Sequence, residues 1–273
     1  MKLKRSERIV DMTATLLDNP NKMFSLKDFT TKYESAKSSI SEDLAIIKET
    51  FENNNIGIVE TIVGSNGGVI YFPKLKPEIQ EMYVEELIND LDNPKRILPG
   101  GYFYLSDIIT NPKYLENIAK VIASQHYGEK IDYVLTVATK GVSVAQAVAK
   151  ELGIPFVIAR KESKITEGST VSVKYKSQSA PNLVKNMEIG RESLKENSDI
   201  LLVDDFFRGG GTINGMASIV EIFNSKVVAS YVICEFNDKG LTQKLNTKSL
   251  VLITGMDPDT GKIDIQKGTI FDK

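Results

Sequence analysis

The 273-residue chain has one cysteine, one histidine and a formal net charge of only −2, and each scarcity excludes a class of protein. Cys234 has no partner for an internal disulfide, so a reducing cytoplasm is expected. A lone His126 without a cysteine cluster argues against a zinc site. The near-neutral charge excludes a globally basic nucleic-acid-binding protein, and no apolar run approaches the roughly 20 residues that span a bilayer. We therefore expect no metal site and no membrane partner, and any contact with DNA must come from a local basic patch.

The composition changes at residues 73–77, where two prolines and two lysines in five residues predict a linker. The expected domains are residues 1–73 and 74–273. Before the linker, Ser6 is a candidate N-cap of a first helix, which the Asn-Pro-Asn of residues 19–21 ends. The helical spacing predicts an apolar face that contains Ile9, Val10, Thr13, Leu16 and Leu17.

The rest of the first domain predicts two more helices and a β-hairpin. Ser25 begins a short helix that carries Phe29 and Tyr33 inward. A third helix follows, and its apolar stripe consists of Ile40, Leu44, Ile47 and Phe51. Residues 58–63 and 69–72 are predicted strands joined by a glycine-rich tip. Three helices followed by a hairpin indicate a winged helix-turn-helix domain.

A winged helix of this kind places its third helix in the major groove of DNA. The residues at the exposed start of that helix are positioned to read base edges, and they are Lys37, Ser38, Ser39 and Ser41. A basic N-terminal edge suits the phosphates, and it consists of Lys2, Lys4, Arg5 and Arg8. The alternative is a protein-interaction module, because residues 1–73 hold nine Lys/Arg and ten Asp/Glu. The uneven distribution, with four basic residues and one acid in residues 1–8, favours a double-stranded DNA operator as partner.

After the linker, predicted strands alternate with predicted helices. Amphipathic patterns predict helices at residues 77–91, 113–125 and 142–152. Apolar runs predict strands at residues 131–137, 155–158, 200–203, 227–234 and 250–253, with a long polar stretch at 162–179. Successive β-α-β units form a mostly parallel sheet with helices on both faces. The fold class is therefore α/β, with a winged helix ahead of a mostly parallel α/β domain.

The most informative segment is residues 201–212, where an apolar run ends in Asp204 and Asp205 and a glycine-rich turn follows. A buried parallel strand delivers polar groups to the carboxyl edge of a sheet in this way. Three consecutive glycines let backbone N–H groups point at one anion, and the following helix adds the positive end of its dipole. The two carboxylates suit sugar hydroxyls or a divalent cation. An ordinary strand–turn–helix with solvated aspartates is the alternative, but the order of groups favours a cradle for a phosphorylated sugar.

Two further strand-end loops are expected at the same edge, because the carboxyl ends of parallel strands lie together. Thr139, Lys140 and Gly141 end one strand, and Arg160 and Lys161 end the next. The three basic side chains supply positive charge, and the glycine allows close approach of the backbone. Each residue alone is more often a solvated surface group, but their joint placement favours one shared site.

The order of groups in residues 203–212 resembles the phosphoribosyl-pyrophosphate (PRPP) motif of type I phosphoribosyltransferases. The resemblance implies that the acids hold ribose, that the glycine turn holds the 5′-phosphate, and that the loop at 139–141 holds pyrophosphate. It also implies a mobile loop within residues 161–179. The sequence departs from the pattern at Arg208, where those enzymes usually carry a small residue. The expected effector-binding residues are Asp204, Asp205, Phe206, Phe207, Arg208, Gly209, Gly210, Gly211, Thr212, Thr139, Lys140, Gly141, Arg160, Lys161 and Tyr102.

With both domains considered, the whole chain resembles the purine operon repressors of low-GC Gram-positive bacteria. The most specific marks are residues 203–212 and the Pro-Gly-Gly-Tyr of residues 99–102. The resemblance implies a cytoplasmic homodimer that represses genes of purine synthesis and transport and has PRPP as its effector. No cofactor is required, and the sequence leaves open whether Mg²⁺ accompanies the ligand.

Two functions from different classes remain after this comparison. The first is a repressor without significant turnover, because the bulk and charge of Arg208 stand in the phosphate loop. The alternative is an active purine phosphoribosyltransferase, of the xanthine or adenine type, with an accessory winged helix. Tyr102, Phe206 and Phe207 either stack a purine or block one. Guanine nucleotides that bear pyrophosphates, including alarmones of the (p)ppGpp type, are expected competitors of PRPP.

Overall fold

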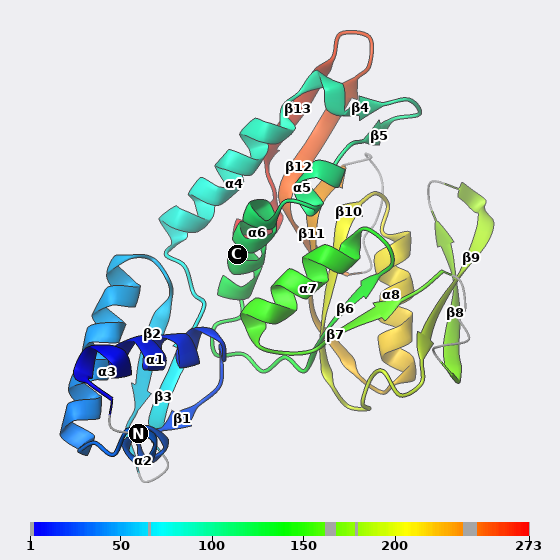
Figure 1. Ribbon diagram of the computed structural model, residues 1–273. Coiled ribbons are helices and arrows are strands. Elements are labelled where there is room, and N and C mark those ends of the chain that lie inside the picture. The colour runs from blue at the N-terminus through cyan, green and yellow to red at the C-terminus, as the bar shows by residue number, and fades with distance from the viewer. Residues whose placement is uncertain (1–2, 65–66, 162–167, 178–179, 237–244, 273) are drawn as a thin grey trace. The chain divides into compact units, whose positions relative to one another are not determined.

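The computed structural model describes residues 3–64, 67–161, 168–177, 180–236 and 245–272 (Figure 1). The chain forms two compact units. The first consists of residues 1–80, 120–129 and 151–153, and the second of residues 81–119, 130–150 and 154–273. In the described parts of the chain, no helix is both long and apolar enough to cross a membrane.

The first unit contains three helices and a small antiparallel sheet (Figure 1). Its elements are α1 (Arg5–Leu17), β1 (Phe24–Ser25), α2 (Leu26–Tyr33), α3 (Lys37–Asn53), β2 (Ile58–Ile62) and β3 (Gly68–Phe72), and the strands lie in the order β1-β3-β2. Ser25 begins α2 because its hydroxyl accepts a hydrogen bond from the Asp28 N–H, while the Asp28 carboxylate accepts one from the Ser25 N–H. The predicted winged helix is confirmed.

The predicted apolar stripe of α3 forms the centre of this unit. Its four members are at most 3% exposed, and they are Ile40, Leu44, Ile47 and Phe51. They pack with Phe29 and Tyr33 of α2, whose rings stack with their centroids 6.1 Å apart. Full burial of one large apolar side chain contributes roughly 1.5–3 kcal/mol. The core therefore holds α3 in place while its opposite face remains exposed.

The predicted phase of α1 is wrong. The helix begins at Arg5 with Lys4 at the N-cap, so Ser6 is not the cap. Val10 is 69% exposed and Leu17 is 43% exposed, although both were assigned to the apolar face. The buried residues of α1 are Arg8, Met12 and Leu16, which follow one another at intervals of four and share one face. The apolar pattern did not predict this face, because one of its three buried residues is an arginine.

The second unit contains a six-stranded sheet with the order β13-β12-β11-β10-β6-β7. Its strands are β6 (Tyr133–Val137), β7 (Phe156–Ala159), β10 (Asp199–Phe207), β11 (Lys226–Phe236), β12 (Thr247–Asp257) and β13 (Lys262–Lys267). All neighbouring strands are parallel except β13, which pairs with β12 in the antiparallel sense. The expected mostly parallel sheet is confirmed, with β13 as a strand that the sequence analysis missed.

The connections contain most of the remaining elements. They are α4 (Pro77–Leu91), the 3-10 turn η1 (Pro94–Arg96), the short hairpin of β4 (Ile97–Leu98) and β5 (Tyr102–Phe103), α5 (Ser106–Ile109), α6 (Pro112–Ser124), α7 (Gly141–Leu152), α8 (Gly211–Ile222) and the 3-10 turn η3 (Thr269–Phe271). The predicted helices at 77–91, 113–125 and 142–152 correspond to α4, α6 and α7.

Part of the polar stretch that predicted a loop forms a β-hairpin instead. Strand β8 (Thr170–Ser177) pairs with β9 (Ala180–Gly190) in the antiparallel sense, and residues 162–167 and 178–179 of the predicted loop lie outside the described residues. Tyr175 and Met187 of the hairpin are buried against Gly215 of α8, where a Cβ would come 3.1 Å from the tyrosine ring and 3.0 Å from the methionine methyl. The hairpin is ordered because alternate side chains reach this core, although the strands are polar on average.

The two edges of the six-stranded sheet differ in construction. Strand β7 at one edge has only four residues. Strand β13 at the other carries Lys262, Asp264 and Lys267, and its pairing with β12 contains a register shift between Ile253 and Gly255. Lys267 also forms ion pairs with carboxylates of α4.

Candidate functional site

The two acidic residues of the predicted site lie inside β10 rather than after its end. The strand continues past them because β11 runs beside it, so that Phe207 pairs with Glu235. Asp204 is 7% exposed, and burial, followed by the charge of Asp205, raises the pKa of its carboxyl well above the ordinary range. Asp204 Oδ1 accepts a hydrogen bond of 3.0 Å from the N–H of half-buried Asp205. The pair therefore places a buried carboxyl next to a partly exposed one near the carboxyl end of the strand.

Gly141, the first residue of α7, lies directly against Asp204. A Cβ at position 141 would stand 2.8 Å from Asp204 Oδ1 and would overlap Thr136 Oγ1 of β6. Only glycine allows this approach of the backbone. Thr136 is fully buried, and its hydroxyl has no hydrogen-bond partner among the residues that the structure describes. The loop after β6 and the acid pair are thus brought together, with Lys140 exposed beside them.

The glycine turn after β10 contains two residues in the left-handed region of backbone conformation. Gly209 and Gly210 have φ angles of 75° and 74°, which side chains disfavour. Gly210 is the N-cap of α8, and no side chain of the described residues caps this end, so the backbone N–H groups of the first turn lack a side-chain partner there. Phe207 is buried against Gly210, while Phe206 and Thr212 are half-buried. Phe207 is therefore a packing residue of the turn rather than a surface on which a base stacks.

The second basic loop follows β7. The N–H and carbonyl of Arg160 exchange hydrogen bonds of 2.8 Å with the carbonyl and N–H of Glu188 in β9, which joins this loop to the β8–β9 hairpin. Lys161 is exposed, and its positive charge lowers the pKa of Asp204, against the larger effect of burial. The positive charge of Lys161 therefore acts on the buried carboxyl of the acid pair.

Arg208 does not place its side chain over the glycine turn, contrary to the sequence prediction. Its Nη1 donates a hydrogen bond of 2.9 Å to the carbonyl of Gly101, and its guanidinium lies 4.8 Å from the centroid of the Phe236 ring. Gly101 has a φ of 73°, and the adjacent Tyr102 is 65% exposed. Arg208 thus connects the end of β10 to the β4–β5 hairpin that carries Tyr102.

A second arginine that the sequence analysis missed supports the same hairpin. Arg96 is buried and binds Asp107 through two hydrogen bonds of 2.8 and 2.9 Å, and it also donates to the carbonyl of Tyr104. The guanidinium holds the pKa of the Asp107 carboxyl below its ordinary value. The sequence did not indicate that Arg96 supports the hairpin, because its partners Tyr104 and Asp107 are identified only by the fold.

The predicted base-reading residues lie at the start of α3. Lys37, Ser38 and Ser41 are exposed and Ser39 is half-buried. A pocket of about 420 Å³ adjoins this end of the helix and extends to β2, and its lining includes Lys37 and Lys27 of α2. Lys27, which the sequence analysis did not single out, is exposed at the start of α2.

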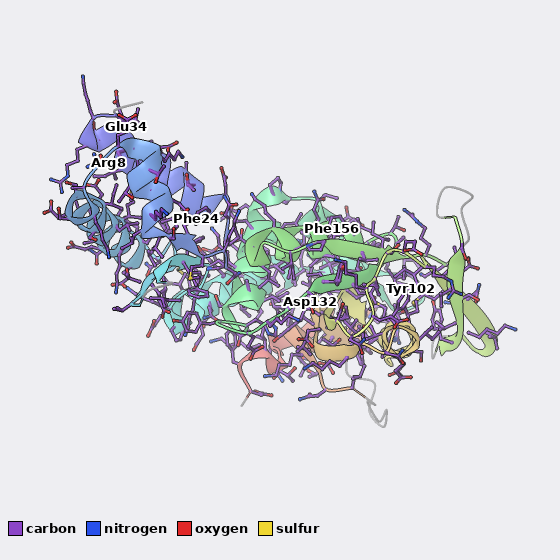
Figure 2. All side chains as sticks on the ribbon, turned by 90° about the horizontal axis from the view of Figure 1, so that it is seen from below. Arg8, Phe24, Glu34, Tyr102, Asp132 and Phe156 are labelled. Carbon is purple, nitrogen blue, oxygen red and sulfur yellow. The ribbon has the colours of Figure 1, made fainter. Side chains whose placement is uncertain are left out.

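The predicted basic edge is only partly exposed. Lys4 and Arg5 are exposed, and Lys2 lies outside the described residues. Arg8, which is labelled in Figure 2, is buried, and its Nε donates a hydrogen bond of 2.6 Å to Asp43. Its placement on an exposed edge was wrong, because the buried Asp43 carboxylate holds it inside.

Comparison with known families finds one match in each half of the chain. The family described as bacterial purine repressor, N-terminal, matches residues 4–73, and the phosphoribosyl transferase domain family matches residues 106–257. The solved structure of adenine phosphoribosyltransferase from Thermoanaerobacter pseudethanolicus superposes with a TM-score of 0.53 over 62% of this chain and 98% of that one. At 21% sequence identity, this likeness establishes the fold. In the described residues, no group of three or more Asp, Glu, His or Cys side chains has the arrangement of a metal site.

The curated relatives cover the chain from end to end. The probable purine biosynthesis transcriptional regulator PurR of Streptococcus pneumoniae is 46% identical over 100% of this chain and 99% of the relative. The purine biosynthesis transcriptional repressor PurR of Bacillus subtilis is 45% identical over 99% and 95%, and the purine biosynthesis transcriptional activator PurR of Lactococcus lactis is 44% identical over 98% and 99%. These relatives are regulators rather than enzymes. The chain therefore belongs to the PurR family of bacterial purine biosynthesis transcriptional regulators.

Proposed function

We propose that this regulator represses genes of purine biosynthesis and transport, and that PRPP binding to the second unit releases it from its DNA operator. The relative from Bacillus subtilis is a repressor and the relative from Lactococcus lactis is an activator, and the two are about equally identical to this chain. Repression, rather than activation, is therefore part of the proposal. The winged helix supports binding to double-stranded DNA, with Lys37, Ser38, Ser39 and Ser41 at base edges and Lys4 and Arg5 at phosphates.

The contact between Gly141 and Asp204 carries the PRPP assignment. It places the loop after β6 beside the acid pair, as a ligand with groups at both ends of a ribose requires. In the proposed complex, the N–H groups of the glycine turn bind the 5′-phosphate, and the carboxylates of Asp204 and Asp205 accept hydrogen bonds from the ribose hydroxyls. Thr139, Lys140 and Lys161 bind the pyrophosphate, and Arg160 supplies further positive charge.

Mg²⁺ fits this site as a companion of the ligand rather than as a resident ion. Asp204 and Asp205 offer hard oxygen donors, and Mg²⁺ in phosphate sites is commonly held by one or two carboxylates together with the substrate phosphates. Two carboxylates alone are too few for a cage made only of protein groups. Effector binding is therefore expected to strengthen when Mg²⁺ is added to PRPP.

Turnover is proposed to be absent or feeble. Transfer requires a base aligned with the sugar carbon, and near-attack geometry supplies about 7–11 kcal/mol of such a barrier. Arg208 instead holds the β4–β5 hairpin through the Gly101 carbonyl, and the described residues contain no evident set of donors that would select one purine. Incubation with PRPP and each purine base, read by pyrophosphate release, tests this point. Robust nucleotide formation would support the enzyme alternative.

Alarmones of the (p)ppGpp type are proposed to compete with PRPP, because the basic loops recognise pyrophosphate more than the group attached to it. Exposed Tyr102 and half-buried Phe206 offer aromatic surface for a guanine. Displacement of labelled PRPP by the nucleotide measures this competition, and no displacement at millimolar concentration would contradict it.

The deciding experiment separates effector binding from DNA binding. Asp204→Ala combined with Asp205→Ala removes the charged acceptors of the ribose hydroxyls, each worth about 1.5–3 kcal/mol. Calorimetry is expected to show loss of PRPP binding, while gel shifts show wild-type affinity for DNA and no release by PRPP. Glu192→Gln, at an exposed carboxylate of the same unit, is the matched control. Unchanged PRPP affinity in the double variant would reject the assignment.

Homodimer formation is also part of the proposal, because two copies of a recognition helix match the two-fold symmetry of a palindromic operator. Light scattering of the free protein and of its DNA complex measures the stoichiometry. One chain per operator would contradict this part alone.

A further inference from the structure

A buried carboxylate of α3 joins three parts of the winged helix. Asp43 is 0% exposed, and its two oxygens accept hydrogen bonds from two arginines of α1. Arg5 Nε donates to Oδ1 at 3.0 Å, and Arg8 Nε donates to Oδ2 at 2.6 Å. Arg5 and Arg8 lie three residues apart, so they share one face of α1. The Asp43 carboxylate therefore binds two arginines that lie on the same face of α1.

Arg8 extends the same connection to the turn between α2 and α3. Its Nη1 donates a hydrogen bond of 3.1 Å to Ser35 Oγ, which in turn donates one of 3.0 Å to the carbonyl of Tyr33 at the end of α2. Arg8 is 8% exposed, so its guanidinium forms these hydrogen bonds in the interior of the unit. A single arginine thus links α1, the turn and, through Asp43, the second turn of α3.

The hydrophobic core restricts the rotation and axial position of α3 less than these hydrogen bonds do. Contacts between aliphatic side chains are non-directional, and cores tolerate repacking with loss of uniqueness before loss of stability. Hydrogen bonds from a guanidinium to a carboxylate restrict both distance and angle. Buried ion pairs contribute little net stability, because desolvation opposes the attraction, and their best-attested benefit is structural register.

We infer that Asp43 is a positioning residue for DNA recognition, which with Arg8 fixes the rotation and axial position of α3. This inference rests on the proposed role of α3 as the base-reading helix. Ser41 is two residues from Asp43, and Lys37 and Ser38 lie in the preceding turns of the same helix. Because an α-helix turns by 3.6 residues and rises 1.5 Å per residue, a small slip of α3 moves these side chains off their base edges.

The test replaces the pair without changing the charge of the domain. Arg8→Met combined with Asp43→Leu removes one positive and one negative charge and supplies apolar groups of similar volume. A high-affinity duplex is first selected from random DNA by the wild-type protein, and a scrambled duplex serves as the non-specific probe. We expect the variant to remain folded by circular dichroism and to bind the scrambled duplex as wild type does. Its affinity for the selected duplex should fall at least tenfold.

The salt dependence distinguishes positioning from a direct contact. Because Arg8 and Asp43 are buried, the replacement removes no phosphate contact, and the salt slope should not fall below the wild-type value even though Arg5 loses its Asp43 partner. The matched control is Lys48→Gln with Glu52→Gln, a charge-neutral change at an exposed ion pair within α3 itself, whose atoms are 4.0 Å apart. This control should keep full discrimination between the two duplexes.

A second variant covers the case in which the double replacement does not fold. Arg8→Lys keeps the charge but cannot bridge Asp43 and Ser35 with a planar fork, so discrimination should fall while the fold is retained. Wild-type discrimination in any folded variant that lacks the bridge would overturn the inference and leave the DNA-binding role intact. Absence of sequence preference in the wild-type protein itself would instead reject the proposed function.

Discussion

Gly141 and Asp204 are in direct contact across two strands of the sheet, with no room for a β-carbon between them. That atom would stand 2.8 Å from Asp204 Oδ1. The contact makes the backbone at the start of α7 part of the wall that holds the buried carboxyl. Any side chain at position 141 would therefore displace the buried carboxyl of β10.

Gly141→Ala is expected to weaken PRPP binding at least tenfold. The added methyl overlaps Thr136 Oγ1 and presses on Asp204, so the carboxylate must leave the position from which it is proposed to bind ribose. Overpacking of a close contact also costs about 1–3 kcal/mol of stability. Calorimetry with PRPP and a thermal melt measure both effects. Gln146→Ala on the exposed side of α7 is the control, and equal PRPP affinity in the two variants would contradict the expectation.

Asp204→Asn is expected to stabilise the protein at neutral pH and little at acidic pH. Burial raises the pKa of Asp204 above its ordinary value of 3.8, so the folded state favours the protonated form. The stability that this carboxyl contributes is present below pH 3.8 and is lost as the pH rises towards the folded-state pKa. The asparagine variant does not incur that loss. Its melting temperature should exceed that of wild type increasingly above pH 4.

Asp257 provides the control, because its pKa is shifted in the opposite direction from that of Asp204. The pKa of Asp257 is lowered, first by the Thr260 hydroxyl and then by backbone N–H groups, so its ionised form stabilises the turn. That contribution is present above pH 3.8 and is lost as the pH falls through the lower folded-state pKa. Asp257→Asn should therefore lower the melting temperature at neutral pH. Shifts of the same sign in the two variants would refute the assignment of the Asp204 effect to burial.

Arg208→Gln is expected to loosen the β4–β5 hairpin with little effect on global stability. The variant loses the hydrogen bond to the Gly101 carbonyl and the contact with Phe236, and an exposed cation–π contact is worth about 0.5–1 kcal/mol. Hydrogen exchange at the Gly101 and Tyr102 amides should accelerate severalfold. Arg191→Gln, at an exposed arginine of the same unit, should leave these amides unchanged. Equal exchange in both variants would show that Arg208 does not restrain the hairpin.

Basic residues of the first unit are expected to separate into two groups by their salt dependence. Lys4→Gln removes a phosphate contact, so all sequences should bind more weakly and the salt slope should fall by about 0.9. Lys37→Ala should mainly relax the preference for the selected duplex, since a good base contact discriminates by about 1–3 kcal/mol. Lys48→Gln, further along α3, is the control. Gel shifts over a range of salt measure all three, and equal effects on both duplexes would place Lys37 among the phosphate contacts.

Periodicity predicted the elements whose burial is apolar. The α3 stripe was correct because Ile40, Leu44, Ile47 and Phe51 are hydrophobic and follow one helical face. The phase of α1 was wrong because Arg8 is buried by a partner 35 residues away. No local pattern contains that information. The same reason explains why Arg96 was missed as the support of the β4–β5 hairpin.

Strand ends and polar hairpins were harder to predict than strand centres. Strand β10 was expected to end before its two acids, but pairing with β11 carries it to Phe207. The β8–β9 hairpin was hidden because few of its side chains are apolar, although Tyr175 and Met187 anchor it to α8. The residues of the candidate site could be proposed from the sequence because glycine spacing and paired acids are local signals. The direction of the Arg208 side chain could not be predicted from neighbouring residues, because Gly101 and Phe236, which are distant in the sequence, determine it.

The construction of the sheet edges has a consequence for self-association. A long, flat and apolar edge strand invites another chain to add a strand, which leads to aggregation. Strand β7 is too short for this, and β13 opposes it with Lys262, Asp264 and Lys267 next to an irregular register. Two copies of this chain therefore have no suitable sheet edge in the described residues through which to continue one another. The parallel sheet that carries the candidate site therefore does not also serve as a template for fibres.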